Sequence, residues 1–555
     1  MIITNLSKLN NVWKLKQANI NLIESIKTNY NLSNLSSQYL ANKKIEFEEI
    51  QNYLNPTLKN NWIKAEDIPN IEYAKQTIIS TIQNKEKIGI IGDYDVDGIC
   101  SAIIMKELFE EFKIETSVWI PNRQDGYGPS QAALNFFEKN PVDLLILVDC
   151  GTTSHEFNNK YNKKILIIDH HHALNPIKNC VINPNATAEI NISSKDKLQS
   201  LCATSLAFFI TSSILKELKH KDYQKTMKSW LDLVALATIC DVMPLNNLNR
   251  ALVKAGIKQI EKQERIGLRQ LINFANIKFP ITTKDIAFAI GPRLNATGRI
   301  ETPEISFNLL KTKSFEEADK LIHRIEMTNN YRKEIQNNSF QEALKIAKNE
   351  SNQILCIANE NWNPGIVGIV AAMIQEEESK PTIIGSIVNN EIKASARSKS
   401  VNIGMLIEKA VELSLLEKGG GHKAAAGLTC KIEKWQEFKE WINNQNIKID
   451  QNIIEIDGIA DLNEIEKDYK TMAPFGLGNE EPKVLVKNLH ILKIIEKENY
   501  SLVILESNYK ESSFFIQKSK QRLLEELKSL YQQKSTFSAV LNLSEKNNPT
   551  IEDIY

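Results

Sequence analysis

Apolar runs alternate with helix-period segments between residue 87 and about residue 303. The runs at 87–92, 142–147 and 164–168 have the length of buried strands, and segments such as 98–112 and 230–240 carry apolar residues at helical spacing. Strands that alternate with helices predict a doubly wound parallel sheet. We therefore expect residues 81–312 to form an α/β domain around such a sheet.

Two helical segments are expected to flank this domain. Residues 1–80 show short amphipathic patterns punctuated by Pro56 and Pro69, which predict an N-terminal helical extension. Residues 313–350 are highly charged and carry apolar residues at helical spacing without proline or glycine. This pattern predicts one or two long exposed helices that connect two lobes.

The pattern changes twice more toward the C-terminus. Residues 351–452 contain strand-like runs at 353–357 and 381–388 and a glycine cluster at 419–421, which predict a second, smaller α/β domain. Residues 453–555 show short alternating runs broken by one helix-like segment, a pattern typical of a small β-barrel.

Composition limits this picture further. The chain has 555 residues, 42% hydrophobic and 25% charged, which is ordinary for a globular protein of about two to four domains. Basic and acidic residues balance at 68 each, so any surface for nucleic acid must be local; residues 483–534 carry ten basic and six acidic side chains. Seven cysteines without a Cys-x-x-Cys pair, and no signal-like or membrane-length apolar segment, predict a cytoplasmic protein without a membrane partner.

Three motifs rich in aspartate and histidine follow the apolar runs. They are Asp93-Tyr94-Asp95-Val96-Asp97-Gly98, Val148-Asp149-Cys150-Gly151 and Asp169-His170-His171-His172. Parallel strands place whatever follows their carboxyl ends along one crevice, so these side chains are expected to converge. Asp241, which follows the apolar helical run at 230–240, is a fourth candidate for the same place.

Such a set favours a site for hard divalent cations. Several carboxylate oxygens with one imidazole suit Mg²⁺ or Mn²⁺ better than a structural zinc, which prefers thiolates or several histidines. Each motif alone has a simpler interpretation, because an Asp-x-Asp-Gly sequence can cap a helix and adjacent histidines can be surface or core residues. Three motifs at coincident strand ends are harder to explain by caps, and they favour the metal site.

The motifs, taken in order, resemble those of the DHH phosphoesterase superfamily. The matching stretches are residues 92–98, 121–123, 125–128, 169–171, 233–236, 241–245, 291–299, 395–398, 419–427 and 474–479. Within the superfamily the chain is most similar to the exonucleases that degrade single-stranded DNA from the 5′ end, and the resemblance runs from about residue 85 to the C-terminus. It implies a DHH catalytic domain at 81–312, a DHH-associated domain at 351–452 and an OB-like nucleic-acid-binding domain at 453–555.

The resemblance also implies roles for the acidic and histidine residues. Asp95, Asp97, Asp149, His170 and Asp241 would hold two Mn²⁺ or Mg²⁺ ions, with Asp149 bridging. Asp93 would orient a ligand beside the ions, and His171 would contact the phosphate or aid the leaving oxygen. Two such ions lower the pKa of a shared water, polarise the phosphodiester and stabilise the attacking and departing oxygens.

Arginines are the candidate phosphate-binding residues, because their planar guanidinium group suits phosphate better than the point charge of lysine. The candidates for phosphate or DNA are Arg123, Arg293, Arg299, Ser395, Arg397 and His422. Each arginine alone could equally be solvated or ion-paired. The resemblance assigns Ser395 and Arg397 to a pocket for the terminal 5′-phosphate. The glycines at 419–421 could form either a concavity of backbone N–H groups that binds an anion or a flexible turn.

Two positions depart from the pattern of the superfamily. Asn363 stands where a histidine often follows the tryptophan. Around Cys202-Ala203-Thr204-Ser205 the expected small glycines are missing, so a local backbone contact is expected to differ.

The sequence therefore predicts a single-stranded-DNA-specific 5′-to-3′ exonuclease that releases 5′-mononucleotides in DNA repair and recombination. A helicase and a single-strand-binding protein are partners that only the resemblance implies. Two alternatives stay open. One is a phosphodiesterase for short or cyclic oligonucleotides, which the long C-terminal barrel disfavours; the other is a DNA-binding scaffold without catalysis, which the complete carboxylate set disfavours.

Overall fold

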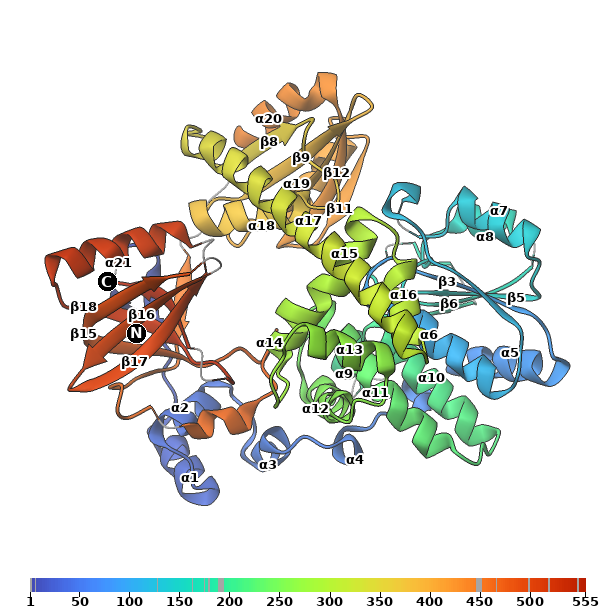
Figure 1. Cartoon of the computed structure of the whole chain (residues 1–555), viewed down its shortest axis with the longest axis horizontal. Coiled ribbons are helices and arrows are strands. Elements are labelled where there is room, and N and C mark those ends of the chain that lie inside the picture. The colour runs from blue at the N-terminus through green and yellow to red at the C-terminus, as the bar shows by residue number, and fades with distance from the viewer. Residues whose placement is uncertain are drawn as a thin grey trace. The chain divides into compact units, whose positions relative to one another are not determined.

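The computed structural model describes residues 2–4, 6–126, 128–161, 163–173, 175–177, 180–187, 194–445, 452–465, 467–497, 500–517, 520–546 and 549–555. Tyr127 of the 125–128 motif lies outside these residues. The chain folds into two compact units that interleave along the sequence (Figure 1). The first comprises Met1–Ile50, Tyr331–Ala473 and Glu481–Tyr555, and the second comprises Gln51–Asn330 and Pro474–Glu480. We call them unit 1 and unit 2.

A five-stranded parallel sheet forms the centre of unit 2, as the apolar runs predict. Its strands lie in the order β4-β3-β5-β6-β7. They are β3 (Ile88–Gly92), β4 (Thr116–Trp119), β5 (Leu144–Val148), β6 (Lys164–Ile168) and β7 (Val181–Ile182). Because the chain moves outward from β3 to β4 and then back past β3 to β5, the sheet is doubly wound with a switch point between β3 and β5.

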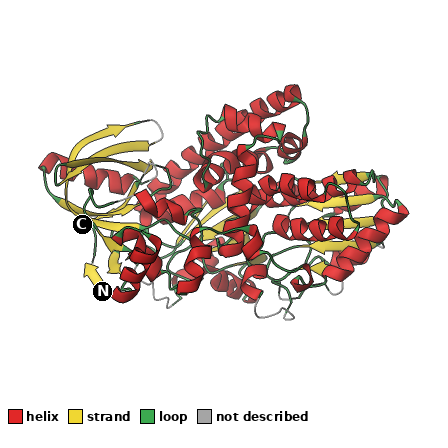
Figure 2. Cartoon of the chain, turned by 90° about the horizontal axis from the view of Figure 1, so that it is seen from below, coloured by secondary structure: helices red, strands yellow, loops and turns green. Residues whose placement is uncertain are grey.

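Helices cover both faces of this sheet (Figure 2). Successive residues of β5 alternate between two apolar cores: Ile146 and Val148 pack with one, and Leu145 and Leu147 with the other. The first core contains α5 (Ile71–Asn84), α6 (Val96–Glu111), α10 (Ala203–Glu217) and α11 (Tyr223–Cys240); the second contains α7 (Gln131–Lys139) and α8 (His155–Lys160).

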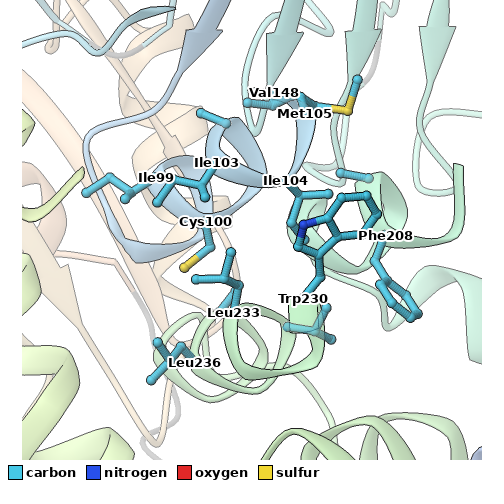
Figure 3. Close-up of a cluster of buried hydrophobic side chains, with 14 of the residues drawn as sticks. Ile99, Cys100, Ile103, Ile104, Met105, Val148, Phe208, Trp230, Leu233 and Leu236 are labelled. Carbon is cyan, nitrogen blue, oxygen red and sulfur yellow. The ribbon is translucent and has the colours of Figure 1, made fainter. Parts of the chain in front are cut away.

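The first core is built around α6. Ile99, Ile103 and Ile104 of α6 lie between the sheet and the side chains of Phe208, Trp230 and Leu233 (Figure 3). A helix that is apolar on almost all sides is stable only when it is enclosed. Burial of α6 therefore holds its first turn, which carries Asp97, against the end of β3.

Further helices complete unit 2 beyond Asp241. They are α12 (Asn247–Glu261), α13 (Ile266–Phe274), α14 (Thr283–Asp285), α15 (Gly291–Ile300) and α16 (Glu304–Lys311). The charged segment then forms one helix of 34 residues, α17 (Phe315–Lys348), which begins in unit 2 and ends in unit 1. The predicted boundaries after residues 312, 350 and 452 fall between regular elements, whereas the one after residue 80 falls inside α5.

Unit 1 contains a second, mostly antiparallel sheet with the strand order β11-β12-β10-β9-β8. Its strands are β8 (Leu355–Asn359), β9 (Thr382–Val388), β10 (Glu391–Arg397), β11 (Lys418–Gly421) and β12 (Ala425–Lys431). It packs with α18 (Val367–Glu378), α19 (Ile403–Glu412) and α20 (Trp435–Asn443). The glycine cluster is strand β11, paired with β12, and so forms neither a flexible turn nor an isolated loop. The hairpin turn follows it at His422, where His422 N donates to Ala425 O at 2.8 Å.

The C-terminal part of unit 1 is a small closed barrel. Strands β15-β16-β17-β19-β18 follow one another, and β18 pairs back onto β15. Their bounds are β15 (Lys483–Glu496), β16 (Tyr500–Ser507), β17 (Lys510–Gln517), β18 (Phe537–Asn542) and β19 (Thr550–Ile554), with α21 (Gln521–Gln533) beside β15 and β14 (Gly458–Ile459) pairing with β15. Five strands that close on themselves are compatible with the expected OB-like barrel.

The N-terminal extension differs from the expectation of helices alone. It contains α1 (Ile20–Tyr30), α2 (Asn34–Asn42), α3 (Ile50–Leu54) and α4 (Leu58–Asn61), but two strands precede them, β1 (Ile2–Thr4) and β2 (Val12–Leu15). β2 pairs in parallel with β13 (Ile453–Ile456). Strands of three or four residues give too short a periodic signal to be predicted, and the partner of β2, β13, lies more than 400 residues away in sequence.

In the residues that the structure describes, no helix is both long enough and apolar enough to cross a membrane.

Candidate metal centre

The turn from β3 into α6 places three carboxylates at the switch point of the sheet. Asp93 follows β3 directly, Asp95 caps α6 by accepting from Asp97 N and Gly98 N at 3.0 and 3.1 Å, and Asp97 lies in the first turn of the helix. Gly98 allows this tight packing, because a Cβ there would lie 2.4 Å from Asp93 N and O. The sequence Asp-x-Asp-x-Asp-Gly thus forms a helix cap and also presents carboxylates to one crevice.

Asp97 is fixed by a second helix. Its two carboxylate oxygens accept from Ala203 N at 2.8 Å and Thr204 N at 2.9 Å, at the first turn of α10. Free N–H groups at a helix N-terminus favour an anion. Ala203 and Thr204 lie in the segment where the superfamily's glycines are expected, and their backbone N–H groups contact Asp97.

Asp149 and His170 follow the next two strands. Asp149 comes directly after β5 in a left-handed conformation, with φ of +62°, and is buried. His170 follows β6, and its Nε2 lies 3.3 Å from Asp149 Oδ1, 3.4 Å from Asp241 Oδ2 and 3.7 Å from Asp97 Oδ2. Asp97, Asp149 and Asp241, which lie far apart in sequence, therefore meet around the imidazole of His170.

Asp241 reaches the site from the end of α11. Its N–H donates to Ala237 O at 2.9 Å, and its side chain is more exposed than those of Asp97 and Asp149. The residue after it, Val242, has a φ of +55°. The helix end thus aims Asp241 at His170 through an unusual backbone turn.

Asp169 organises the histidine pair. Its Oδ1 lies 2.8 Å from His171 Nδ1 and accepts from His170 N at 2.8 Å, while its Oδ2 accepts from Thr152 Oγ1 at 2.6 Å. Burial alone would raise the pKa of Asp169, but the hydrogen bonds from His171 and Thr152 outweigh it and lower the pKa. Burial alone would lower the pKa of His171, but the bond to Asp169 raises it to about 9. His171 is thus held as a cation beside the carboxylates.

The electrostatics of the remaining acids favour a bound cation. Burial, followed by the charges of neighbouring aspartates, raises the pKa values of Asp93, Asp149 and Asp241 well above their usual range. Burial also lowers the pKa of His170. Asp93 Oδ1 is buried, and among the described residues it has no hydrogen-bond partner. Crowded, buried carboxylates of this kind are stabilised when they coordinate cations.

Three overlapping groups of side chains could each hold an ion. They are Asp93 with Asp95 and Asp149, Asp97 with His170 and Asp241, and Asp149 with His170 and His171, and in each group the ligand atoms lie within 4.8 Å of one another. Asp149 is shared by two of these groups. Oxygen-rich sets with one or two imidazoles fit Mn²⁺ or Mg²⁺.

A cavity of about 310 Å³ opens beside these carboxylates. Arg123 stacks its guanidinium 4.4 Å from the centre of the Tyr94 ring, and Arg299 is also on the cavity wall. The full lining is Asp93, Tyr94, Asp95, Arg123, His171, Cys240, Asn295, Gly298 and Arg299. Two arginines on the wall of an acidic site can hold a phosphate next to the carboxylates.

Arg293 has a different environment. Its Nε lies 2.7 Å from Glu326 Oε2 and its Nη2 lies 3.3 Å from Glu326 Oε1, so that it joins α15 to α17. It is not among the residues that line the cavity of about 310 Å³. A DNA contact from Arg293 stays a prediction, because this structure uses its fork in an ion pair.

Ser395, Arg397 and His422 lie in unit 1. Ser395 and Arg397 are alternate residues of β10 and so leave the same face of its sheet, close to the first turn of α18. A Cβ on Gly368 there would lie 3.1 Å from Arg397 Nη2 and 3.2 Å from Ser395 Oγ. Burial lowers the pKa of Arg397, and no described carboxylate forms an ion pair with it. His422 is exposed on the turn between β11 and β12, and Asn363 accepts from Gly365 N at 2.7 Å just before α18.

Several supporting residues were not identified from the sequence. Asn183 donates to Thr152 Oγ1 and to His171 O, and Asn295 accepts from Val96 N, so both hold the loops that carry the acids. Gly298 lets α15 approach Tyr94, since a Cβ there would lie 2.4 Å from Tyr94 O. The Gly-Pro-Arg-Leu-Asn-Ala-Thr-Gly stretch was the available signal for Asn295 and Gly298, whereas nothing in the sequence marks Asn183.

Two family descriptions match the chain. Residues 87–238 match the N-terminal domain of the DHH family, and residues 351–447 match the DHHA1 domain. The first match contains all of the candidate metal ligands except Asp241. The second contains Ser395, Arg397 and His422.

Several curated relatives carry the name single-stranded-DNA-specific exonuclease RecJ. The one from Bacillus subtilis is 26% identical over 495 residues, covering 86% of this chain and 61% of the relative. The one from Haemophilus influenzae is 28% identical, covering 81% of this chain and 83% of the relative. The chain thus spans less than two thirds of the Bacillus subtilis protein.

Solved structures match the fold. The Mn²⁺ complex of RecJ from Thermus thermophilus superposes with a TM-score of 0.79 at 20% identity and covers 98% of this chain and 79% of its own. A second RecJ exonuclease bound to manganese has a TM-score of 0.58 at 25% identity, covering 69% of this chain and 96% of its own.

Proposed function

We propose that this chain, as a RecJ-type member of the DHH phosphoesterase superfamily, is a single-stranded-DNA-specific 5′-to-3′ exonuclease. It would release 5′-mononucleotides by metal-dependent hydrolysis of the phosphodiester. The observation that carries the proposal is the meeting of Asp97, Asp149 and Asp241 around His170 at the switch point of the parallel sheet. Burial disfavours the charged forms of Asp149 and Asp241, which bound cations would stabilise.

Asp95, Asp97, Asp149, His170 and Asp241 would hold two Mn²⁺ or Mg²⁺ ions, and Asp149 belongs to two of the three candidate groups. When bound, such ions supply an activated water and stabilise charge on the reacting oxygens. The chain's own contribution is rigidity: the α10 N-terminus fixes Asp97, and Asp169 fixes the ring of His171. Preorganised ligands need no rearrangement when the substrate arrives.

His171 and the two arginines of the cavity would contact the phosphate. Arg123 and Arg299 both line the cavity beside the carboxylates, so each can donate to a non-bridging phosphate oxygen. His171, whose Nδ1 is held by Asp169, can donate a proton toward the departing 3′-oxygen from its position near Asp149. Asp93 is placed to orient a ligand beside Asp95.

The direction of digestion, from the 5′ end, would be determined by residues of unit 1. Arg397, partly buried and without a carboxylate partner among the described residues, lies with Ser395 beside the first turn of α18. A helix N-terminus, a hydroxyl and a guanidinium together favour a doubly charged terminal phosphate over an internal diester. Ser395 and Arg397 are thus proposed to bind the 5′-phosphate.

The setting proposed is DNA repair and recombination in the cytosol. A helicase would supply single strands, and a single-strand-binding protein would present them. The closed barrel of unit 1 would extend the track for the strand, because its segment at 483–534 has a local surplus of basic residues.

The first test follows nucleotide release from 5′-phosphorylated single-stranded DNA with Mn²⁺. Wild type should release mononucleotides, a 5′ block but not a 3′ block should protect the strand, and Asp149→Ala should be inactive. Turnover of dinucleotides or cyclic dinucleotides without release from long strands would favour the small-substrate phosphodiesterase instead. Binding without any turnover would favour the scaffold, and equal cleavage of blunt duplex would contradict strand specificity.

Arg397→Ala tests the polarity pocket. The preference of the wild type for 5′-phosphate over 5′-hydroxyl ends should fall about 10- to 100-fold, the worth of charged hydrogen bonds of about 1.5–3 kcal/mol. Lys431→Ala, which removes an exposed charge at the end of β12, is the matched control and should keep the preference. An unchanged preference in Arg397→Ala would remove Arg397 from the pocket while leaving the metal site intact.

A further inference from the structure

The backbone that follows Asp241 is strained. Val242 N donates to Ile239 O at 3.2 Å and Met243 N donates to Thr238 O at 3.0 Å, the two hydrogen bonds of a Schellman helix end. Such an end requires a left-handed residue, normally glycine, and here it is Val242 with φ of +55°. Val242 is 62% exposed, so burial of its side chain contributes little to offset the strain.

A short turn from far along the chain holds this connection. Leu245 N donates to Leu477 O at 2.7 Å, and Asn249 Nδ2 donates to Pro244 O at 2.8 Å. Gly476 faces the same leucine, because a Cβ there would lie 2.8 Å from Leu245 Cδ1. The Val242–Leu245 connection is therefore anchored at its far end by residues of Pro474–Glu480, which we call the clamp turn.

The clamp turn is closed by its own hydrogen bonds, and its residues Pro474, Phe475 and Asn479 are buried. Gly476 and Asn479 exchange both backbone hydrogen bonds, at 2.9 and 3.0 Å, and Asn479 Nδ2 donates to Pro474 O at 2.8 Å. Tyr53 Oη donates to Asn479 Oδ1, and Thr283 Oγ1 donates to Phe475 O at 2.6 Å. The amide of Asn479 thus pairs with the carbonyl of Pro474 within the turn and with the hydroxyl of Tyr53 outside it.

The position of this turn in the sequence is informative. It belongs to unit 2, although the chain on both sides of it belongs to unit 1, and β15 of the barrel begins three residues after it. The turn leaves its neighbours in sequence and packs against Pro244 and Leu245, a few residues after a candidate ligand, which indicates a structural role beyond linking.

We propose that the clamp turn is a positioning element for Asp241, which it aims at His170 by holding the strained Val242–Leu245 connection. The inference deepens the proposed function and rests on it only in taking Asp241 as a metal ligand. Neither Asn479 nor Thr283 touches the metal centre; they act through Leu245 and the turn. Relief of the strain at residue 242 should make the position of Asp241 independent of the clamp turn.

The test is a titration of the full chain with Mn²⁺, without DNA, followed by electron paramagnetic resonance well below the melting temperature. Asn479→Ala should weaken Mn²⁺ binding about tenfold or more, the usual effect of losing a group that orients a ligand, and Thr283→Val should weaken it less. Val242→Gly alone should bind close to the wild type. The double variant Val242→Gly/Asn479→Ala should recover most of the lost affinity, because glycine adopts the left-handed conformation without strain.

Two controls separate the outcomes. Asn29→Ala, on an exposed face of α1 in unit 1, should leave Mn²⁺ binding unchanged. Asp241→Asn should weaken it; if it does not, the ligand assignment and the proposed site fail. If Asp241→Asn weakens binding while Asn479→Ala and Thr283→Val only lower the melting temperature, the clamp turn is merely structural and the inference is overturned. Absence of recovery in the double variant would contradict the role of strain.

Discussion

At the scale of single residues, the carboxylates of the site are held in opposite ways. Asp97 accepts two N–H groups from α10 and is stabilised as an anion by the fold itself. Asp149 lies buried among the charges of Asp97, Asp95 and Asp93, which raise its pKa after the effect of burial. Asp149 therefore lowers the free energy of unfolding until a cation binds, and such destabilising residues are common at functional sites.

Asp149→Asn should separate stability from function. In EDTA the variant should melt a few degrees higher than the wild type, because relief of about 1 kcal/mol shifts the midpoint of a unit of this size by about 2–4 °C. In Mn²⁺ its stabilisation by the ion should largely disappear, with affinity reduced at least about 100-fold. Differential scanning fluorimetry in both conditions measures this, with exposed Asp319→Asn on α17 as the control. A lower melting temperature in EDTA would show that the carboxylate stabilises the metal-free fold.

At the scale of elements, the site depends on how closely α6 approaches β3. A Cβ at Gly98 would lie 2.4 Å from the backbone of Asp93, a contact that side-chain motion cannot relieve. Alanine favours a helix over glycine by about 1 kcal/mol, but overpacking costs about 1–3 kcal/mol and here acts directly on the turn that carries the acids.

Gly98→Ala should therefore lower Mn²⁺ affinity about tenfold or more while circular dichroism still reports a folded chain. Titration with Mn²⁺ measures the effect. Gly427→Ala, a strand position in unit 1 where a Cβ meets nothing within 4 Å, is the control and should bind Mn²⁺ as the wild type does. Equal affinity in Gly98→Ala and wild type would show that the α6 start can shift without moving Asp95 and Asp97.

The elements that the sequence could predict are those whose pattern is local. Fully buried parallel strands appear as continuous apolar runs, which is why β3, β5 and β6 and the residues after them were found. The glycines of β11 were expected as an anion-binding concavity or a flexible turn, because glycine carries no side-chain pattern, and only the pairing with β12 makes them a strand. The ion pair of Arg293 with Glu326 could not be predicted for a similar reason, because nothing in the sequence indicates which acid lies beside Arg293.

At the scale of the whole molecule, the division into units does not follow the sequence. Residues 1–50 belong with the C-terminal part, and the clamp turn returns to unit 2. Trp13 of β2 is 1% exposed and donates from Nε1 to Asp553 Oδ2 at 2.8 Å, where Asn11 Nδ2 also donates at 3.0 Å. Domain boundaries read from patterns could not anticipate these pairings, because each depends on two segments hundreds of residues apart.

Trp13→Phe should destabilise unit 1 without affecting the metal centre. The fully buried carboxylate of Asp553 loses one of its donors, a loss worth about 1–3 kcal/mol. Urea unfolding should show an earlier transition, while Mn²⁺ affinity of the folded protein stays unchanged. Trp62→Phe, at a half-exposed position in unit 2, is the control and should leave the transition of unit 1 in place. Unchanged unfolding in Trp13→Phe would mean that Asn11 alone suffices for Asp553.

The pairing of β2 with β13 also imposes a delay during synthesis, because β2 is made long before its partner. Val12 is made about 440 residues before Ile453, the residue it pairs with. At about 5–20 residues per second, the first segment waits about 20–90 s on the ribosome for its partner. During that interval the indole of Trp13 and the edge of β2 are without their final cover. The newborn chain is therefore most exposed to aggregation at its beginning, and a chaperone that binds the first residues would protect it until the last strands are made.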